Sequence, residues 1–486
     1  MTLVVVNAVG LTPRALEHMP RLSRLGAEGF RARLDPVLPA VTCSVQASML
    51  TGLTPSDHGI VGNGWFFRGL GEVFLWRQHN KLVEGEKVWE TARLAKSGFR
   101  AANVCWWYAL GASTDVTVTP RPVYHADGRK SPDCYTFPPR LHDALTGALG
   151  PFPLFRYWGP KADIASSEWI AGAARIVLAH EQLDLLLVYL PHLDYDHQRF
   201  GPEGAEAVRA ARELDAVAGD LVDFARGRGD KVVVLSEYGI TPARRPVQIN
   251  RALRRAGFLS VYTQAGMEYL DPWTSRAFAV ADHQIAHVYV ADDAAIPAVR
   301  ETLLALPGVG ELLEGEAVAA AGLAHPRAGE LVALADRDAW FTYHYWLDDR
   351  RAPDFARQVE IHRKPGYDPA ELFMDPDDRR VKLRAAVALA RKAAGMRYVL
   401  DVVGPNASKH VKGTHGLLPE KELDAPVLLC SEASSASERL GAVDVRDLLL
   451  DLADVRTARA SDGARIGHRR RARQPAGASG SSGPPE

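Results

Sequence analysis

Three short apolar runs, spaced far apart in the chain, limit the folds that this sequence can adopt. Leu3–Val6, Leu183–Leu190 and Lys231–Leu235 each hold one polar residue at most, so strands formed by them would be covered on both faces, as in a parallel sheet. Segments with helical periodicity separate these runs, which predicts an α/β fold: a doubly wound, mostly parallel sheet with helices on both faces. The expected helices are Pro13–Gly29, Val88–Ser97, Ile164–His180 and Glu203–Arg228, and the further expected strands are Phe30–Leu38 and Arg100–Trp107.

Polar residues follow each apolar run. Asn7 comes after the first run, Asp194 after the second, and Glu237 and Tyr238 after the third, while Thr42 follows the extended segment that ends near Leu38. Ligands of open α/β sheets gather beyond the carboxyl ends of the strands. The convergence of four such ends predicts a binding crevice at that edge of the sheet.

The segment from residue 42 to residue 52 has the composition of a buried helix. It begins at Thr42, consists of small and apolar residues, and ends at Gly52, a typical helix C-terminal residue. Thr42 would then lie at a helix N-terminus, where free backbone N–H groups and the helix dipole favour negative charge. The alternative is that Thr42 or Ser44 only caps the helix.

Composition and charge exclude several classes of protein. The 486 residues are 47% hydrophobic and 24% charged, with a net charge of −1, so no basic field favours a nucleic acid polymer. The four scattered cysteines predict neither a disulfide framework nor a thiolate zinc site. No apolar window reaches the roughly 18 residues of a membrane span. A cytoplasmic protein with a small-molecule ligand is expected; the oligomeric state stays open.

The regular alternation of strands and helices weakens after residue 255. We expect a core at 1–255, an inserted cap region at 256–400, rich in aromatic and charged residues, and a return to the core at 401–456. The segment 457–486 is rich in Arg, Gly, Ser and Pro and is expected to be a disordered tail. Its run Arg469–Arg473 could touch an anionic surface, although a solvated tail is the simpler interpretation.

Three blocks of the sequence carry recognisable motifs. Leu38–Thr42 is followed by Thr-Gly-Leu-Thr-Pro-Ser-Asp-His-Gly-Ile at 51–60 and then by Asn63; the other blocks are Leu-Pro-His-Leu-Asp at 190–194 with Gly-Pro at 201–202, and Gly413–Gly416. Together they resemble the type I phosphodiesterase/nucleotide pyrophosphatase group of the alkaline phosphatase superfamily. The resemblance implies an alkaline phosphatase-like fold in which Thr42 is the attacking hydroxyl and Asn63 hydrogen-bonds a phosphate oxygen.

The resemblance also implies divalent metal ions, zinc in the usual case, which activate the threonine and polarise the phosphoryl group. Several expected ligands are changed here. Asn7 replaces an aspartate, Ser236–Gly239 reads Ser-Glu-Tyr-Gly in place of Ser-Asp-His-Gly, and an Asp-x-x-x-His pair becomes Asp194 and Gln198, with His197 one position away. The candidate metal-site residues are Asn7, Thr42, Asp194, His197, Gln198, Glu237, Tyr238 and His415.

These changes remove charge and imidazole nitrogen from the expected site. Amides offer only a neutral carbonyl oxygen, and a phenol ionises near pH 10. The binding of zinc is therefore expected to be weaker, and Mg²⁺, Mn²⁺ or Ca²⁺ becomes relatively more plausible. One ion, held by Asp194, His415 and either His197 or Gln198, is favoured over two, and a site without metal stays open.

Other side chains are weaker candidates. His283 and His287 could bind a metal if their segment were helical, but Val288–Val290 favours a strand and hence a place in the cleft or core. The polar segment His362–Pro369 is expected to be a solvent-facing turn, with substrate contact as the alternative. Three further expectations concern residues near the motifs: Cys43 is disfavoured as a nucleophile, His58 is expected to be structural, and Trp106, Trp107 and Tyr108 are expected to pack in the core or line a pocket.

Three functions remain compatible with the sequence. The first is a hydrolase of a phosphorus ester (a phosphodiester or nucleotide-like compound, or else a monoester or phosphonate) that uses Thr42 and a divalent metal. The second is a metal-poor member that binds a phosphorylated ligand or serves a biosynthetic pathway. The third is a phosphotransferase, which shares the first half of the reaction.

Overall fold

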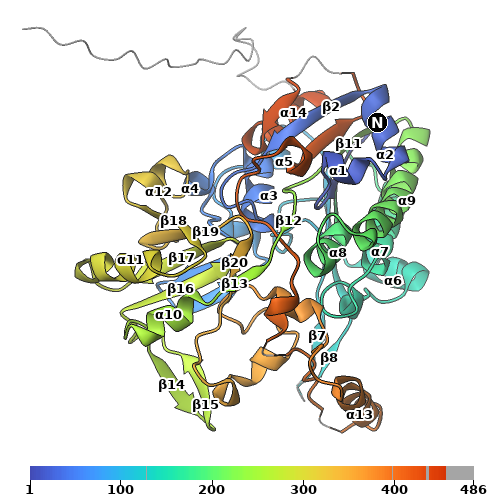
Figure 1. The fold of residues 1–486 in the computed structure, drawn as a ribbon. Helices are drawn as coiled ribbons and strands as arrows, with labels where there is room; N and C mark the ends of the chain where they lie inside the picture. Colours follow the sequence, from blue (N-terminus) through green and yellow to red (C-terminus); the bar gives the residue numbers. More distant parts are fainter. Residues whose placement is uncertain (127–128, 397, 405, 434–436, 456–486) are drawn as a thin grey trace, which may run out of the picture.

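The computed structural model describes residues 1–486 except 127–128, 397, 405, 434–436 and 456–486. The predicted tail, including Arg469–Arg473, therefore lies outside the described residues. The rest forms a large mixed sheet between two helical layers and a smaller antiparallel sheet beside it (Figure 1).

The large sheet has the doubly wound architecture that the apolar runs predict. In spatial order its nine strands are β23 (Arg439–Gly441), β2 (Phe30–Asp35), β22 (Val427–Cys430), β11 (Lys231–Leu235), β1 (Leu3–Ala8), β10 (Leu185–Leu190), β5 (Ala101–Val104), β6 (Val116–Pro120) and β9 (Cys134–Phe137). The five strands from β11 to β6 are parallel, and β22 and β9 run antiparallel to their neighbours.

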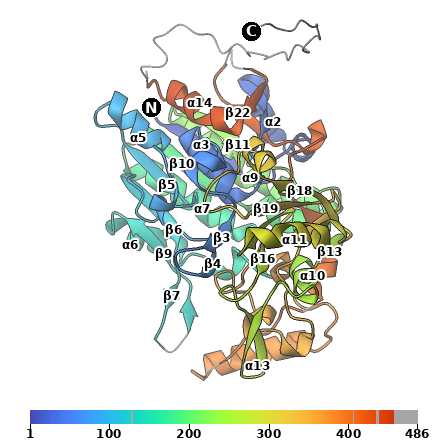
Figure 2. The same ribbon diagram turned by 90° about the vertical axis from the view of Figure 1, so that its left-hand side faces the viewer.

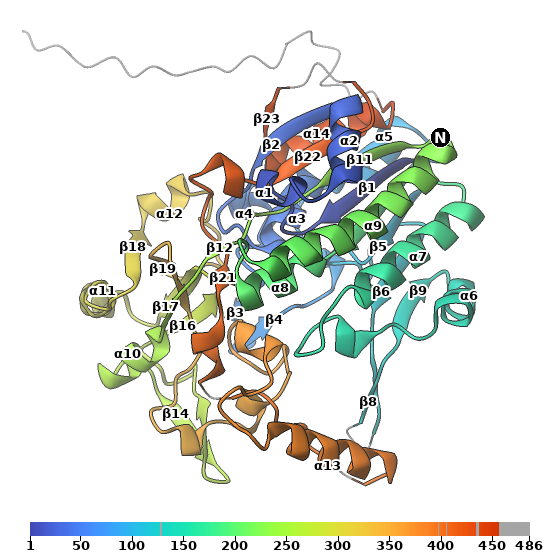
Figure 3. The ribbon, with the colours of Figure 1, turned by 45° about the vertical axis from the view of Figure 1, so that its right-hand side comes forward.

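Helices cover both faces of this sheet (Figure 3). On one face lie α1 (Pro13–Leu16), α2 (Pro20–Glu28), α6 (Arg140–Leu149), α7 (Ala165–His180), α8 (His192–Phe200) and α9 (Ala205–Gly227); on the other lie α3 (Thr42–Thr51), α5 (Val88–Ala95) and α14 (Val445–Leu452). The expectation of a single helix over Pro13–Gly29 is wrong. It breaks into α1 and α2 because Pro20 cannot continue the hydrogen-bond ladder of a helix and instead starts a new one.

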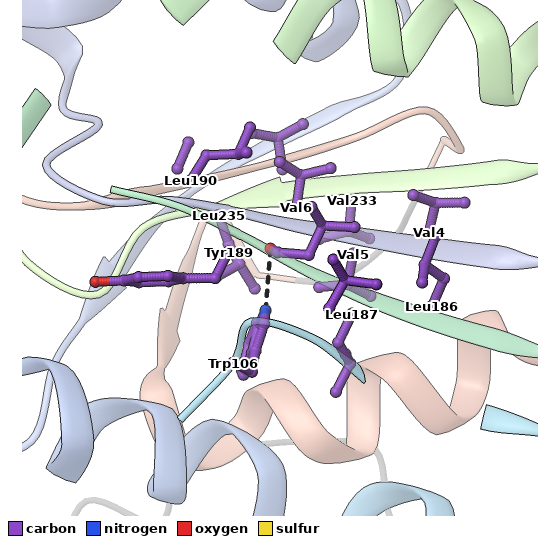
Figure 4. Packing of buried hydrophobic residues seen from close by; sticks show 14 of the residues in the cluster. Val4, Val5, Val6, Trp106, Leu186, Leu187, Tyr189, Leu190, Val233 and Leu235 are labelled. Carbon is purple, nitrogen blue, oxygen red and sulfur yellow. Dashed lines mark hydrogen bonds between the residues drawn. The ribbon is translucent and has the colours of Figure 1, made fainter. Parts of the chain in front are cut away.

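The centre of the sheet is a dry aliphatic core (Figure 4). Val5, Leu187 and Val233 on three neighbouring strands are fully buried. Trp106 packs against them, and its indole N–H donates to the carbonyl of Val188 over 3.0 Å. Trp106 is thus a core residue, and the rigid sheet fixes the strand ends that carry the polar side chains.

The smaller sheet belongs to the region after residue 255 and flanks the large one (Figure 2). It is antiparallel, in the order β16 (Ala277–Asp282), β17 (Ile285–Val290), β19 (Leu331–Ala335) and β18 (Val309–Glu314). The α-helices of this region are α11 (Ile296–Leu304), α12 (Glu316–Ala320) and α13 (Val381–Ala393), and α10 (Ile249–Arg255) directly precedes it. The domain boundaries expected at residues 255, 400 and 456 stay a proposal.

The remaining strands form short pairs, one short α-helix remains, and nine short 3-10 helices also occur in the described residues. The short α-helix and the strand pairs are α4 (Pro55–His58), β3 (Gly64–Phe67) with β4 (Glu72–Leu75), β7 (Val123–Tyr124) with β8 (Lys130–Ser131), β12 (Thr241–Pro242) with β21 (Gly413–Thr414), β13 (Arg245–Val247) with β20 (Ala339–Phe341), and β14 (Val261–Gln264) with β15 (Met267–Leu270). Among the described helices, none combines the length and the hydropathy needed to cross a lipid bilayer.

Candidate functional site

Thr42 is the first residue of the buried helix α3. The N-cap is Val41, which makes no side-chain hydrogen bond, and the Thr42 hydroxyl lies 3.1 Å from the hydroxyl of Tyr238. Thr42 is only 4% exposed. Its hydroxyl therefore does not serve as a helix cap but points to the residues that follow β11.

The polar residues at the ends of β1 and β11 meet beside α3. The amide nitrogen of Asn7 donates to Oε1 of Glu237 over 2.5 Å, and the amide of Gln46 on α3 donates to the same oxygen. The other oxygen, Oε2 of Glu237, and Oδ1 of Asn7 are buried without a hydrogen-bond partner among the described residues. The convergence expected from the parallel sheet thus brings Asn7, Glu237 and Thr42 together.

A second group of side chains surrounds Asp194 on α8. Gln198 donates from its amide nitrogen to Oδ2 of Asp194 over 2.7 Å, and the Tyr238 hydroxyl donates to Oδ1 over 3.4 Å. The carbonyl oxygen of Gln198 accepts a hydrogen bond of 2.8 Å from the hydroxyl of Tyr367. The hydroxyl of Tyr238 thus joins the two groups, because it contacts both Thr42 and Asp194.

His415 faces Asp194 with an unpaired nitrogen. Its Nδ1 lies 2.8 Å from the carbonyl oxygen of Ala40, which can only accept, so Nδ1 carries the proton of the neutral ring. Its Nε2 has no hydrogen-bond partner in the described chain and lies 3.8 Å from Oδ1 of Asp194. The ring stacks on Tyr238 at 3.6 Å between centroids. His415 therefore presents a free lone pair to the site.

Burial controls the protonation of these groups. It raises the pKa of Asp194 to about 7 and that of Glu237 to about 8. Burial also lowers the pKa of His415 well below its ordinary value and raises that of Tyr238. His415 is therefore neutral and Tyr238 protonated at neutral pH, because the low dielectric of the interior disfavours the charged form of each.

Asn63 is held by Asp282 at the end of β16. Oδ2 of Asp282 accepts from the backbone N–H of Asn63 over 2.7 Å, and Oδ1 accepts from the Asn63 side-chain amide over 3.0 Å. Oδ1 of Asn63 accepts from the backbone N–H of Cys43 over 3.0 Å. Asn63 is thereby fixed beside the N-terminus of α3, with one amide hydrogen left for a ligand. No motif or strand-end pattern in the sequence pointed to this role of Asp282.

The two other histidine candidates have separate places. His283 lies in the tight turn between β16 and β17, where its ring stacks on Tyr367 at 3.6 Å and lies 3.8 Å from the His415 ring. His287 lies within β17, and its Nε2 donates to the carbonyl of Val61 over 2.9 Å. The segment is a hairpin and not a helix, so only His283 reaches the site.

Most of the segment His362–Pro369 is buried, with Tyr367 against Gln198 and His283, and the expectation that it is a solvent-facing turn is wrong. Lys364 is 1% exposed and Tyr367 is 4% exposed. The Lys364 ammonium group makes ion pairs with Asp368 at 2.8 Å and with Glu371 at 2.6 Å. These buried pairs anchor the segment and place Tyr367 on Gln198, because a buried ammonium group requires paired carboxylates.

The side chains of three residues near the motifs take no part in the hydrogen bonds that join Thr42, Tyr238 and Asp194. His197 lines a separate pocket of about 160 Å³ with Thr12 and Arg14. Cys43 is fully buried, and burial raises the pKa of its thiol, which disfavours a thiolate nucleophile. His58 bonds to the Ser48 hydroxyl over 2.9 Å, as expected of a structural residue.

A centre for two metal ions needs about three protein ligands for each ion. In the described chain, the only group of three histidine, cysteine or carboxylate side chains with ligand atoms within 4.8 Å of one another is Asp133, just before β9, with Cys134 on β9 and His142 on α6. Around Thr42, both ends of the Gln198 amide are engaged, by Asp194 and Tyr367, and Asn7 donates to Glu237 while its neutral carbonyl oxygen stays unpaired. The residues therefore do not fit two ions. Asp194 and the free lone pair of His415 fit one.

Comparison with known proteins gives one family and one fold. The family model described as type I phosphodiesterase / nucleotide pyrophosphatase matches residues 3–368. An uncharacterized pyrophosphatase/phosphodiesterase of Schizosaccharomyces pombe is 26% identical over 223 residues, 43% of this chain and 38% of that protein. Ectonucleotide pyrophosphatase/phosphodiesterase family member 1 of Rattus norvegicus is 23% identical over 246 residues, 48% of this chain and 23% of that protein. The chain thus spans well under half the length of these relatives.

Two solved structures share the fold over nearly the whole chain. One is an inactive variant of murine ectonucleotide pyrophosphatase/phosphodiesterase 5 in complex with AMP, with a TM-score of 0.57 and 14% identity, covering 94% of this chain and 96% of that chain. The other is phosphonoacetate hydrolase from Sinorhizobium meliloti in complex with phosphonoformate, with a TM-score of 0.59 and 16% identity, covering 93% of this chain and 96% of that chain. At these identities the similarity shows the fold alone, which agrees with the predicted doubly wound sheet.

Proposed function

The chain belongs to the type I phosphodiesterase/nucleotide pyrophosphatase family, and on that premise we propose that it hydrolyses a phosphorus ester with Thr42 as the nucleophile. The observation that carries the proposal is the position of the Thr42 hydroxyl, which lies at the N-terminus of α3 without capping the helix. It is in hydrogen-bond contact with Tyr238, whose hydroxyl also contacts Asp194. A helix N-terminus favours the negative charge that a phosphoryl group brings.

The residues around Thr42 have distinct tasks in this reaction. The N-terminus of α3 and the free amide hydrogen of Asn63 bind the phosphoryl oxygens, while Tyr238 orients the Thr42 hydroxyl. The Thr42 oxygen forms a bond to phosphorus as the bond to the leaving group breaks, and the proton of the Thr42 hydroxyl ends on the leaving group. Water then cleaves the bond between phosphorus and Thr42, which releases the phosphorus product and restores the hydroxyl.

One divalent ion is part of the proposal, held by Asp194 and His415. Zinc is the ion of the family resemblance, but a site with one carboxylate and one imidazole also suits Mg²⁺, Mn²⁺ or Ca²⁺. Such an ion, when bound, supplies positive charge that offsets the charge of the phosphoryl group and favours ionisation of a nearby hydroxyl. Asn7, Gln198, Glu237 and Tyr238 act through hydrogen bonds, and His197 has no part in the site.

The substrate is proposed to be a small phosphorylated molecule. The structural neighbours hold AMP in one case and phosphonoformate in the other, so a nucleotide-like phosphodiester, a monoester and a phosphonate are all candidates. A phosphotransferase is a related candidate, because an acceptor alcohol can replace water in the second step.

Trapping of the covalent intermediate tests this proposal. Protein supplied with Mg²⁺, Mn²⁺, Ca²⁺ or Zn²⁺ is mixed with an aryl phosphodiester, an aryl monoester or phosphonoacetate and quenched in acid within the first turnover. Peptide mass spectrometry should find the added mass on Thr42 for at least one substrate. Modification of another residue, or turnover without any modification of Thr42, would contradict the role of Thr42. The ratio of hydrolysed product to product transferred to added alcohol separates the hydrolase from the transferase.

A second candidate function is a member that binds a phosphorylated ligand without hydrolysing it, in support of a biosynthetic pathway. The hydrogen-bond chain from Tyr367 through Gln198 to Asp194 favours this candidate, because it occupies positions that metal ligands would fill. Calorimetry with AMP and phosphonoformate distinguishes the two. Binding without turnover under any of the four metals supports the second candidate.

Asp282 provides a test of the phosphate-binding role of Asn63. Replacing Asp282 with asparagine removes an acceptor from the Asn63 amide, and we expect kcat/KM to fall about 10- to 100-fold, mainly through KM. The control is Glu330→Gln, because Glu330 accepts a backbone N–H from Val290 over 2.8 Å on the same small sheet but lies outside the cleft. Equal kcat/KM for the two variants would show that Asn63 does not need this support.

A further inference from the structure

Helix α13 presents apolar side chains on the face that points away from the protein. It packs onto the body through Val381 and Ala388, which are buried. On the opposite side, Leu383 is 65% exposed and Val387 48%, while Leu389, 46% exposed, lies on a flank of the helix, about 80° around the axis from Val381. The other residues of the opposite side are the exposed alanines Ala386, Ala390 and Ala393. Surface helices usually carry polar residues here, so this outward face (383, 386, 387, 390 and 393) is unusual.

Apolar exposure continues beyond the helix. Met396 is 54% exposed, and Val399 is 59% exposed. Phe155 is 46% exposed and lies next to α13, since Lys392 Nζ is 5.2 Å from the centre of its ring. Figures 1 and 3 show α13 at the end of the molecule farthest from α14, where the hairpin of β7 and β8 also projects. The apolar residues therefore form one exposed end and are not scattered.

The helix and the residues directly after it carry only positive charge, between aspartates at 375, 377, 378 and 401. The stretch 379–400 contains no aspartate or glutamate. Arg384 and Arg391 border the outward face on one side and Lys382 on the other, by the 3.6-residue period of the helix. Arg384 pairs with Asp378 at the start of the helix. The described cations of the stretch are Arg379, Arg380, Lys382, Arg384, Arg391 and Lys392.

We propose that the outward face of α13 docks on the surface of an anionic lipid bilayer. The face is convex and apolar with cations along its borders, which is the pattern of an interfacial helix whose apolar side chains enter the headgroup boundary while Lys and Arg reach the lipid phosphates. A protein partner would need a matching groove, whereas a fluid bilayer adapts to a single projecting helix. The 13 residues of α13 extend about 20 Å, short of the roughly 30 Å of a bilayer core, so the helix lies on the membrane and does not cross it.

Flotation of the full chain with lipid vesicles tests this proposal. The anionic vesicles contain phosphatidylcholine and about 30% phosphatidylglycerol. We expect the protein to bind them at least about tenfold better than vesicles of phosphatidylcholine alone. The triple variant Leu383→Ser, Val387→Ser, Leu389→Ser should lose at least about tenfold of this binding. Its thermal midpoint should match that of the wild type, because all three side chains are largely exposed.

Two control variants make the result specific. Leu94→Ser removes a leucine that is 77% exposed on α5, at another surface, and should leave vesicle binding unchanged. Replacing Arg469, Arg470, Arg471 and Arg473 with serine should also leave it unchanged, since α13 is intact. Equal binding to both vesicle types, full binding by the triple variant, or loss of binding in the Arg469–Arg473 variant would overturn the proposal. The proposal would also be overturned if the protein bound an acidic polymer such as heparin in preference to the anionic vesicles and the triple variant kept that preference.

Discussion

Replacing Thr42 with valine is expected to reduce kcat for a phosphorus-ester substrate by at least about 1,000-fold, which corresponds to about 4 kcal/mol of transition-state stabilisation. Valine has nearly the shape of threonine but lacks the hydroxyl, so the buried N-terminus of α3 is preserved while the nucleophile is lost. The Tyr238 hydroxyl, 3.1 Å from Thr42 Oγ1, keeps Asp194 as a partner. The measurement is single-turnover kinetics with the substrate identified by trapping, together with the thermal midpoint.

Ser44 offers a matched control on the same helix. Its hydroxyl is also buried and has no hydrogen-bond partner in the described chain, so Ser44→Ala removes an equivalent group two residues away from Thr42. We expect kcat to change by less than about threefold in this variant, because its hydroxyl makes no contact in the cleft. A Thr42→Val protein that keeps more than a tenth of wild-type kcat would exclude Thr42 as the nucleophile. So would a Ser44→Ala protein with the larger loss.

The second large effect concerns the number of metal ions. The wild-type protein is expected to bind one divalent ion at most, whereas the triple variant Asn7→Asp, Gln198→His, Tyr238→His should bind two zinc ions. The change adds a carboxylate and two imidazoles at positions whose present side chains donate hydrogen bonds to Glu237 and Asp194. Loss of a single outer hydrogen bond to a ligand already alters metal affinity by about 10- to 100-fold, so the gain in zinc affinity should exceed about 100-fold.

Metal analysis and zinc titration measure this change without reference to activity. His197→Gln is the control: His197 lines the pocket of Thr12 and Arg14 and not the cleft, so its loss should leave the ion count unchanged. His415→Ala should abolish binding of the single ion, because it removes the free Nε2. Two zinc ions in the wild-type protein, or an unaltered count in the triple variant, would show that the hydrogen-bond chain does not determine metal binding.

The sequence predicted which polar side chains lie close together around Thr42, because the carboxyl ends of parallel strands meet at one edge of the sheet. Apolar runs mark the strands, and the residue after each run must lie at the same edge. Asn7, Glu237 and Asp194 follow from this rule alone, and Thr42 follows from the helix signal after β2.

The contacts that Asp282 and Tyr367 make with the candidate site could not be predicted in this way. Asp282 contacts Asn63 across 219 residues of sequence, and Tyr367 contacts Gln198 across 169. No periodicity or strand-end rule relates such distant segments. The polar composition of His362–Pro369 even predicted solvent exposure, since a sequence does not reveal that Lys364 is neutralised by two carboxylates in the interior.

The order of strands in the large sheet has a consequence for how the protein is made. Strand β22 (Val427–Cys430) lies between β2 (Phe30–Asp35) and β11 (Lys231–Leu235). During synthesis, β2 and β11 can therefore pair with β22 only after residue 430 has left the ribosome. Until then, both strands expose unpaired edges. A nascent chain that stops short of this strand is an aggregation hazard, and chaperones that shield open edges would act on it for most of its translation.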